Sequence, residues 1–85
     1  MSLHPLFTQA ALGKVERERD AQDAKWGDQV NHSDLYWLGI LVEEVGELAK
    51  GIIETYPDGM ITKELTQLAA VAVGWLEARM RRGAT

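Results

Sequence analysis

The segment best suited to chemistry holds three glutamates within five residues. Glu43, Glu44 and Glu47 lie in the stretch Glu43-Glu44-Val45-Gly46-Glu47, inside the mostly apolar run from Leu38 to Ile53. On a helix, the three carboxylates fall within one arc of roughly 100°. Like charges this close raise one another's pKa and destabilise the helix unless a cation lies among them. The pattern indicates a site for a hard divalent cation, because such cations prefer carboxylate oxygens.

A second acidic segment, Glu64-Leu65-Thr66-Gln67, follows a turn at Tyr56-Pro57-Asp58-Gly59. A short turn between two helices makes them pack antiparallel, and Glu47 and Glu64 then differ in level by about one helical turn. Glu44, Glu47, Glu64 and Gln67 can therefore converge on one point. Four oxygen ligands completed by water suit Mg²⁺, with Mn²⁺ as an alternative, better than zinc.

The plainer interpretation of the glutamates is a solvated helix face. The same side of the helix also carries or borders Tyr36, Trp37, Ile40 and Gly51. A face that mixes aromatic, aliphatic and acidic side chains is expected to be covered rather than fully solvated.

Helical periodicity and turn residues predict an all-α protein with a helical hairpin at its centre. The expected helices run from Leu6 to about Lys25, from about Leu35 to Thr55, and from Ile61 or Thr62 to Arg82. Trp26 to Asp34 reads as a loop, in which Ser33 or Asp34 can cap the second helix. Gly83 is a suitable residue just after the last helix.

Two apolar stripes are predicted to form the core. They consist of Leu38, Leu41, Val45, Leu48 and Ile52 on the second helix, and of Leu65, Leu68, Ala69, Ala72, Leu76 and Met80 on the third. The third helix is apolar nearly all round, and two companion helices cannot easily cover it. Residues 1–85 thus predict a single helical domain whose bundle is completed by oligomerisation, since a chain without cysteine has no disulfide to stabilise it.

The net charge of −4 argues against a general nucleic-acid binder. The longest uncharged run, from Leu65 to Leu76, has 12 residues, too few to span a bilayer, and no signal peptide is visible. We therefore expect a soluble, cytoplasmic protein without a membrane partner. Arg79, Arg81 and Arg82 either complement a helix dipole or bind phosphate, and the sequence leaves both interpretations open.

The acidic motif and its flanks resemble the MazG-like nucleoside triphosphate pyrophosphohydrolases of the all-α NTP pyrophosphatase superfamily. The resemblance covers roughly Arg17 to Glu77. It is carried by Lys25-Trp26-Gly27-Asp28-Gln29, Asn31-His32, Glu43-Glu44-Val45-Gly46-Glu47-Leu48-Ala49-Lys50, and Glu64-Leu65-Thr66-Gln67 with the apolar residues that follow. It implies a Mg²⁺-dependent hydrolase that converts (deoxy)nucleoside triphosphates to the monophosphate and pyrophosphate and works as a homodimer or homotetramer. The role that the resemblance implies is the removal of unwanted nucleotides.

The resemblance also implies roles for individual residues. Glu44, Glu47 and Glu64 would be metal ligands, with Gln67 at a fourth position where relatives usually have aspartate. Glu43 would be a further ligand or the catalytic group that orients the attacking water. Substrate contacts would come from Trp26 and His32 near the nucleobase and from Lys50 near the phosphates.

Two other functions fit the same sequence. The first is a catalytically weak nucleotide-binding or regulatory module on the same scaffold, which the amide at Gln67 makes plausible because an amide contributes no charge to the metal. The second is a helical interaction protein whose acids serve only solubility. The aromatic residues among the acids disfavour this second alternative.

Overall fold

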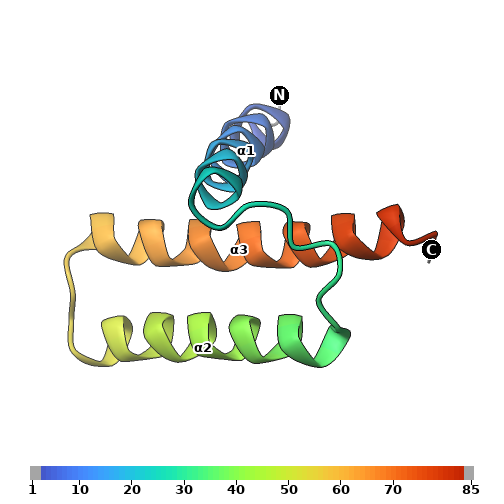
Figure 1. Cartoon of the computed structure of the whole chain (residues 1–85). Helices are drawn as coiled ribbons and strands as arrows, with labels where there is room; N and C mark the ends of the chain where they lie inside the picture. The colour runs from blue at the N-terminus through green and yellow to red at the C-terminus, as the bar shows by residue number, and fades with distance from the viewer. Residues whose placement is uncertain (1–2, 84–85) are drawn as a thin grey trace.

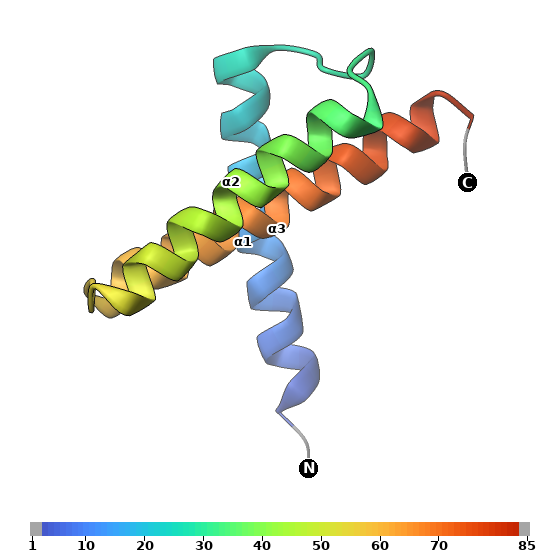
Figure 2. The ribbon, with the colours of Figure 1, turned by 90° about the horizontal axis from the view of Figure 1, so that it is seen from below.

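The chain forms three α-helices in the computed structural model, which describes residues 3–83. α1 spans His4–Trp26, α2 spans Asp34–Ile53 and α3 spans Asp58–Arg81. α2 and α3 lie antiparallel as a hairpin, and α1 packs across α3 (Figures 1 and 2). Residues 3–83 contain no strand. The predicted all-α fold with a central hairpin is thus confirmed.

The ends of the helices agree with the predicted caps at two points and differ at a third. The Ser33 hydroxyl accepts the Tyr36 N–H at 3.2 Å and caps α2, and Gly83 follows α3 with a φ of 83°. α3, however, begins at Asp58 rather than at Ile61 or Thr62. The carbonyl of Pro57 already accepts hydrogen bonds from the N–H groups of Met60 and Ile61. The helix therefore begins directly after the proline, and residues 58–60 belong to its first turn rather than to the preceding loop.

The interior of α2 is not the stripe that the sequence predicted. Leu38, Val45 and Ile52 are 45%, 48% and 58% exposed, whereas Trp37 is 5% exposed and Gly51 is buried. Trp37 and Gly51 of the neighbouring, mixed face are therefore buried, and Leu41 of the predicted stripe packs against the same cluster. The predicted core stripe is wrong for Leu38, Val45 and Ile52 in the single chain. The expectation that this mixed face is covered is confirmed for Trp37 and Gly51, whereas Tyr36, Glu43 and Glu47 are exposed.

α3 shows the same shift from one face to its neighbour. Leu65, Leu76 and Met80 of the predicted stripe are more than half exposed. The buried residues are small or of medium size: Ala70, Val71, Gly74 and Ala78. Small residues on this face allow the neighbouring helices to approach α3 closely.

Gly74 marks a close approach of all three helices. A Cβ atom at this position would lie 3.2 Å from Cη2 of Trp37 and 3.3 Å from Cζ of Arg19. Trp37 comes from α2 and Arg19 from α1, so both companion helices meet α3 at this glycine. A buried cluster of Trp37, Val71 and Ala78 surrounds the contact.

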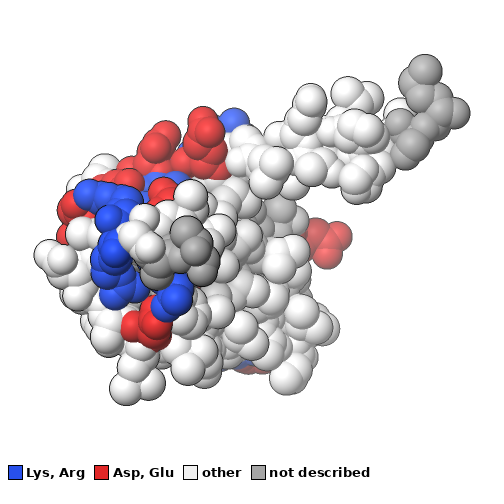
Figure 3. Space-filling model, turned by 90° about the vertical axis from the view of Figure 1, so that its right-hand side faces the viewer, with Lys and Arg blue, Asp and Glu red and all other residues white. Residues whose placement is uncertain are grey.

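Much of the surface is apolar. Large hydrophobic side chains are exposed along all three helices, and the first half of α1 projects from the hairpin (Figure 2). The end of the molecule near the C-terminus carries arginines beside acidic residues, next to broad uncharged areas (Figure 3). No helix within residues 3–83 is long and apolar enough to cross a membrane.

Candidate functional site

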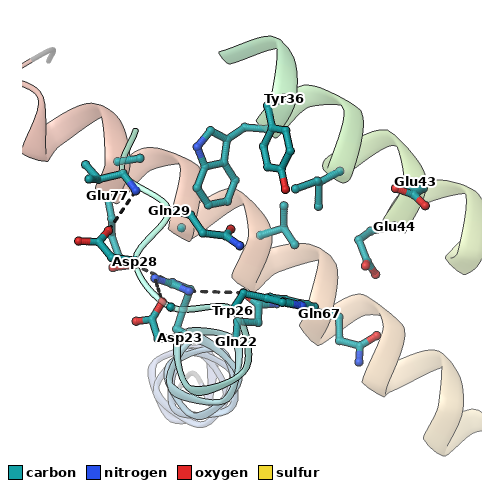
Figure 4. A pocket seen from close by; sticks show the side chains of 18 of the residues that line it. Gln22, Asp23, Trp26, Asp28, Gln29, Tyr36, Glu43, Glu44, Gln67 and Glu77 are labelled. Atoms are coloured by element: carbon teal, nitrogen blue, oxygen red, sulfur yellow. Dashed lines mark hydrogen bonds and ion pairs between the residues drawn. The ribbon is translucent and has the colours of Figure 1, made fainter. Parts of the chain in front are cut away.

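A pocket of about 800 Å³ lies between the second half of α1, the loop at residues 27–33, and the facing sides of α2 and α3 (Figure 4). Its wall on α3 includes residues spaced alternately three and four apart, with Glu77 beside them: Glu64, Gln67, Val71, Gly74, Ala78 and Arg81. This spacing keeps side chains on one face of a helix. The pocket is therefore a groove along α3 with acids at one end and an arginine at the other.

The acidic end of the groove is built by α2 and α3 together. Glu43, Glu44 and Glu47 line it from α2, and Glu64 and Gln67 line it from α3. The structure thus brings all five predicted catalytic and metal-binding residues to one pocket. Glu44 and Gln67 are seen on opposite helices in Figure 4.

The charge at this end is uncompensated. None of the ion pairs within residues 3–83 involves Glu43, Glu44, Glu47 or Glu64. Partial burial raises the pKa of the Glu44 carboxyl above its ordinary value, and the charges of Glu64, Glu47 and Glu43 raise it further. The four carboxylates therefore repel one another, and a cation that lay among them would be bound favourably.

The carboxylate oxygens are suitable ligands for a hard cation, but in this structure the side chains do not converge on one metal position. Within residues 3–83, no group of three or more His, Cys, Asp or Glu side chains is close enough to hold a metal ion. Glutamate side chains on exposed helix faces can turn by rotation about their χ angles. The donor set fits Mg²⁺, and the predicted convergence of Glu44, Glu47, Glu64 and Gln67 stays a prediction.

The middle of the groove is aromatic. Trp26, at the end of α1, faces Tyr36 and Trp37 of α2 across the pocket, with Val71 on α3 nearby. Trp26 is 53% exposed and carries the Lys25 ammonium 4.9 Å from its ring centroid. These aromatic faces can stack on a planar heterocycle.

Two predicted substrate contacts lie outside the pocket. His32 does not line it but stacks on Tyr36, which does, with ring centroids 3.9 Å apart. Lys50 is exposed on α2 and also does not line the pocket. The structure thus gives His32 a supporting position behind Tyr36, and the substrate contacts of His32 and Lys50 stay predictions.

The arginines at the end of α3 anchor the loop and the start of α2. Arg81 holds Asp28 through two hydrogen bonds, while Arg79 and Arg82 both reach Asp34. Trp75 also donates its indole N–H to Asp34 at 2.8 Å. Arg79 and Arg81 lie in the last turn of α3, and Nε of Arg82 donates to the Ala78 carbonyl at 3.3 Å, as the helix-dipole interpretation predicts. The pairing with aspartates of another segment was not predicted, and phosphate binding stays a prediction.

The sequence interpretation gave no individual role to several pocket residues, among them Gln22 and Gln29, and did not predict that the indole N–H of Trp37 is buried. Nε1 of Trp37 is the one fully buried side-chain nitrogen or oxygen without a hydrogen-bond partner within residues 3–83. Gln22 is 7% exposed although glutamine is usually a surface residue. No sequence signal marks Gln22, since isolated glutamines are common on solvated helices.

Comparisons of this chain with family models, with curated proteins and with solved structures found no match. The functional interpretation therefore depends on the chemistry of the pocket and on the resemblance of its motifs.

Proposed function

We propose that this protein hydrolyses (deoxy)nucleoside triphosphates to the monophosphate and pyrophosphate with the help of Mg²⁺. The observation that carries the proposal is the composition of one groove. It has uncompensated carboxylates at one end and aromatic side chains about two to three helical turns away. A nucleotide has the matching arrangement, with a metal-binding polyphosphate at one end and a stacking base at the other.

Glu44, Glu47 and Glu64 would hold the metal, with the amide oxygen of Gln67 as a neutral fourth ligand. When bound, Mg²⁺ would neutralise phosphate charge and polarise the phosphorus that is attacked. Glu43 lines the same end of the pocket and would orient the attacking water by accepting one of its protons. Trp26 would stack on the base and keep the nucleotide aligned along the groove.

The resemblance to MazG-like proteins also supports this proposal. The residues that carry it, from the Trp26 segment to the Glu64 segment, include those that line the groove. Gln67 departs from the usual aspartate and removes one negative charge. Metal affinity should accordingly be lower than with an aspartate at this position.

A second copy of the chain would complete the fold. The accessible surface of the chain is 6291 Å², whereas a folded monomer of 9.5 kDa is expected to expose about 5,000 Å². The difference exceeds the roughly 800 Å² that each partner buries in a standard interface. The exposed apolar residues of α2 that would be covered are Leu35, Leu38, Val42, Val45 and Ile52. We propose a homodimer or homotetramer.

The test is pyrophosphate release from a panel of NTPs and dNTPs with and without Mg²⁺. Glu44→Gln and Glu47→Gln should each lower kcat/KM by more than roughly 100-fold, because each removes a charged ligand. Glu16→Gln, at an exposed acid of α1, is the matched control and should retain activity. Full activity of both α2 variants would exclude the metal assignment.

A catalytically weak nucleotide-binding module is the second candidate. Gln67 and the loose arrangement of the acids favour it. In this case, nucleoside triphosphates should quench tryptophan fluorescence without release of pyrophosphate. Gln67→Asp should then tighten Mg²⁺ binding and raise hydrolysis, since it restores the missing charge.

A further inference from the structure

Gln22 is the one buried polar or charged residue within residues 3–83, and it lines the groove. It comes from the second half of α1, on the opposite side of the groove from Trp37. Burial of a carboxamide is costly unless its polar atoms find partners. Both the oxygen and the nitrogen of the Gln22 carboxamide are therefore expected to have hydrogen-bond partners.

Arg19 determines which way this carboxamide points. Nη1 of Arg19 donates to Oε1 of Gln22 at 3.5 Å. The guanidinium is itself held by Glu77 at 2.7 Å and by Asp23 at 3.0 Å, so it cannot readily turn away. A flipped carboxamide would place its own N–H groups against the guanidinium donors, donor against donor.

The amide nitrogen of Gln22 consequently faces away from Arg19. No residue within 3–83 accepts a hydrogen bond from this Nε2 atom, as the contacts of Gln22 show. Nε2 is accessible to solvent, because within residues 3–83 the one fully buried side-chain nitrogen without a partner is Nε1 of Trp37. A free, pre-oriented N–H donor thus lies at the wall of the groove.

The donor lies in the part of the groove suited to a base. Trp26 and Tyr36 flank this part, and the side chain of Gln29 extends between them in Figure 4. Gln29 has no side-chain hydrogen bond to any residue within 3–83, and its carboxamide can present either its oxygen or its nitrogen. In this orientation Gln22 presents a donor, while Gln29 can adapt.

We propose that Gln22 makes the site selective for nucleotides whose base presents a carbonyl oxygen at this edge. Such keto bases are uracil, thymine, guanine and hypoxanthine. Their carbonyl accepts the Gln22 N–H, and their adjacent ring N–H donates to the Gln29 oxygen. The amino group of cytosine or adenine places donor against donor at Gln22. The inference rests on the proposed function and names the substrate class of that site.

The test uses two pairs of nucleotides that differ at one exocyclic group, UTP with CTP and ITP with ATP. Pyrophosphate release should favour the keto member of each pair by at least roughly fivefold in kcat/KM, the effect of one hydrogen bond. Binding of UMP, CMP, IMP and AMP in EDTA, followed by tryptophan fluorescence, gives the same comparison without metal or hydrolysis.

Variants of Gln22 separate this role from a merely structural one. Gln22→Leu should remove the preference. Gln22→Glu should reverse it, because a carboxylate pairs more strongly with Arg19 and presents an acceptor to the amino group of cytosine or adenine. Gln9→Leu, at an exposed glutamine of α1, is the control and should keep the preference.

Each outcome decides between the two proposals. Equal kcat/KM values and equal binding within both pairs, or a preference that survives in both Gln22 variants, would overturn the role of Gln22 while leaving the hydrolase proposal intact. Absence of both hydrolysis and binding for all nucleotides would overturn the proposed function and this inference with it.

Discussion

Arg81 donates two parallel hydrogen bonds to the Asp28 carboxylate, of 2.9 and 2.8 Å. These bonds connect the last turn of α3 to the loop that follows α1. Both residues line the groove. The Asp28 carboxylate also accepts the backbone N–H of Val30 at 3.0 Å, which folds the loop back on itself. Held in this way, the loop supports Gln29 and Trp26 against the base region of the groove.

Arg81→Ala should loosen the loop without unfolding the helices. The fork that holds Asp28 is lost, so the Val30 N–H should exchange with solvent several-fold faster in amide hydrogen exchange. Arg81→Lys should restore only part of the protection, because lysine lacks the planar fork. Arg17→Ala, at an exposed arginine of α1, is the control; equal exchange in the Arg17 and Arg81 variants would contradict the anchoring role.

Asp34 should make the protein sensitive to acid. The hydrogen bond from Trp75 lowers the pKa of the Asp34 carboxyl, and the guanidinium of Arg79 lowers it further. A carboxyl with a depressed pKa stabilises the fold above its unfolded value of 3.8, and this stability is lost as pH falls through the folded pKa. Asp34→Asn should therefore lower Tm at neutral pH and flatten its decline below pH 4. Asp20→Asn, at an exposed acid of α1, should leave the profile unchanged.

Glu44 should have the opposite effect on stability. Its pKa is raised, so the folded state retains a proton that the unfolded state loses as pH rises above 4.5. The penalty is absent in acid and complete at neutral pH. Glu44→Gln should stabilise the metal-free protein at pH 7 by about 0.5 kcal/mol, as expected for partly solvated like charges, and by nothing at pH 3. Urea unfolding in EDTA at both values measures this, and a destabilised variant at pH 7 would contradict it.

Gly74→Ala and Gly39→Ala should differ in sign. A Cβ atom at Gly74 would press on Trp37 and Arg19 at 3.2–3.3 Å, and we expect a loss of about 1 kcal/mol in the free energy of unfolding. Gly39 has no atom within 4 Å of such a Cβ, so alanine there should gain up to about 1 kcal/mol from helix propensity. Thermal unfolding compares the two, and stabilisation by Gly74→Ala would show that the three helices do not meet closely there.

Val45→Lys should dissociate the proposed oligomer. The side chain is 48% exposed in the single chain and lies within the apolar stripe of α2. Sedimentation equilibrium should shift from a dimer or tetramer toward the 9.5 kDa monomer. Ala21→Lys, at an exposed position of α1, is the control and should not shift it. A native chain that sediments as a monomer would exclude the proposed assembly.

The position of the acids was predictable because it depends on local geometry. Glu43, Glu44 and Glu47 share one side of a helix whatever surrounds it, and the short turn at Pro57 makes α2 and α3 antiparallel. These two constraints bring Glu64 and Gln67 to the same pocket. The start of α3 was misplaced because proline, aspartate and glycine favour a turn and the first helical turn alike.

The face of each helix that enters the interior was not predictable from apolar content. On α2, the stripe with Leu38 and Val45 is the more hydrophobic, and the mixed stripe with Trp37 and Glu44 lies one residue, or about 100°, away. The structure buries the mixed stripe against α3, because the small surface of Gly74 admits the Trp37 ring there. The more apolar stripe stays exposed and available for another copy of the chain.

The sequence by itself determined the three helices, the hairpin and the shared side of the glutamates, since each follows from neighbours in the chain. Only the tertiary structure decided that Gln22 is buried and that the C-terminal arginines hold Asp28 and Asp34. The burial of Gln22 depends on how α1 crosses α3, and the contacts of Asp34 depend on how the start of α2 lies beside the end of α3. No local pattern in the chain encodes either arrangement.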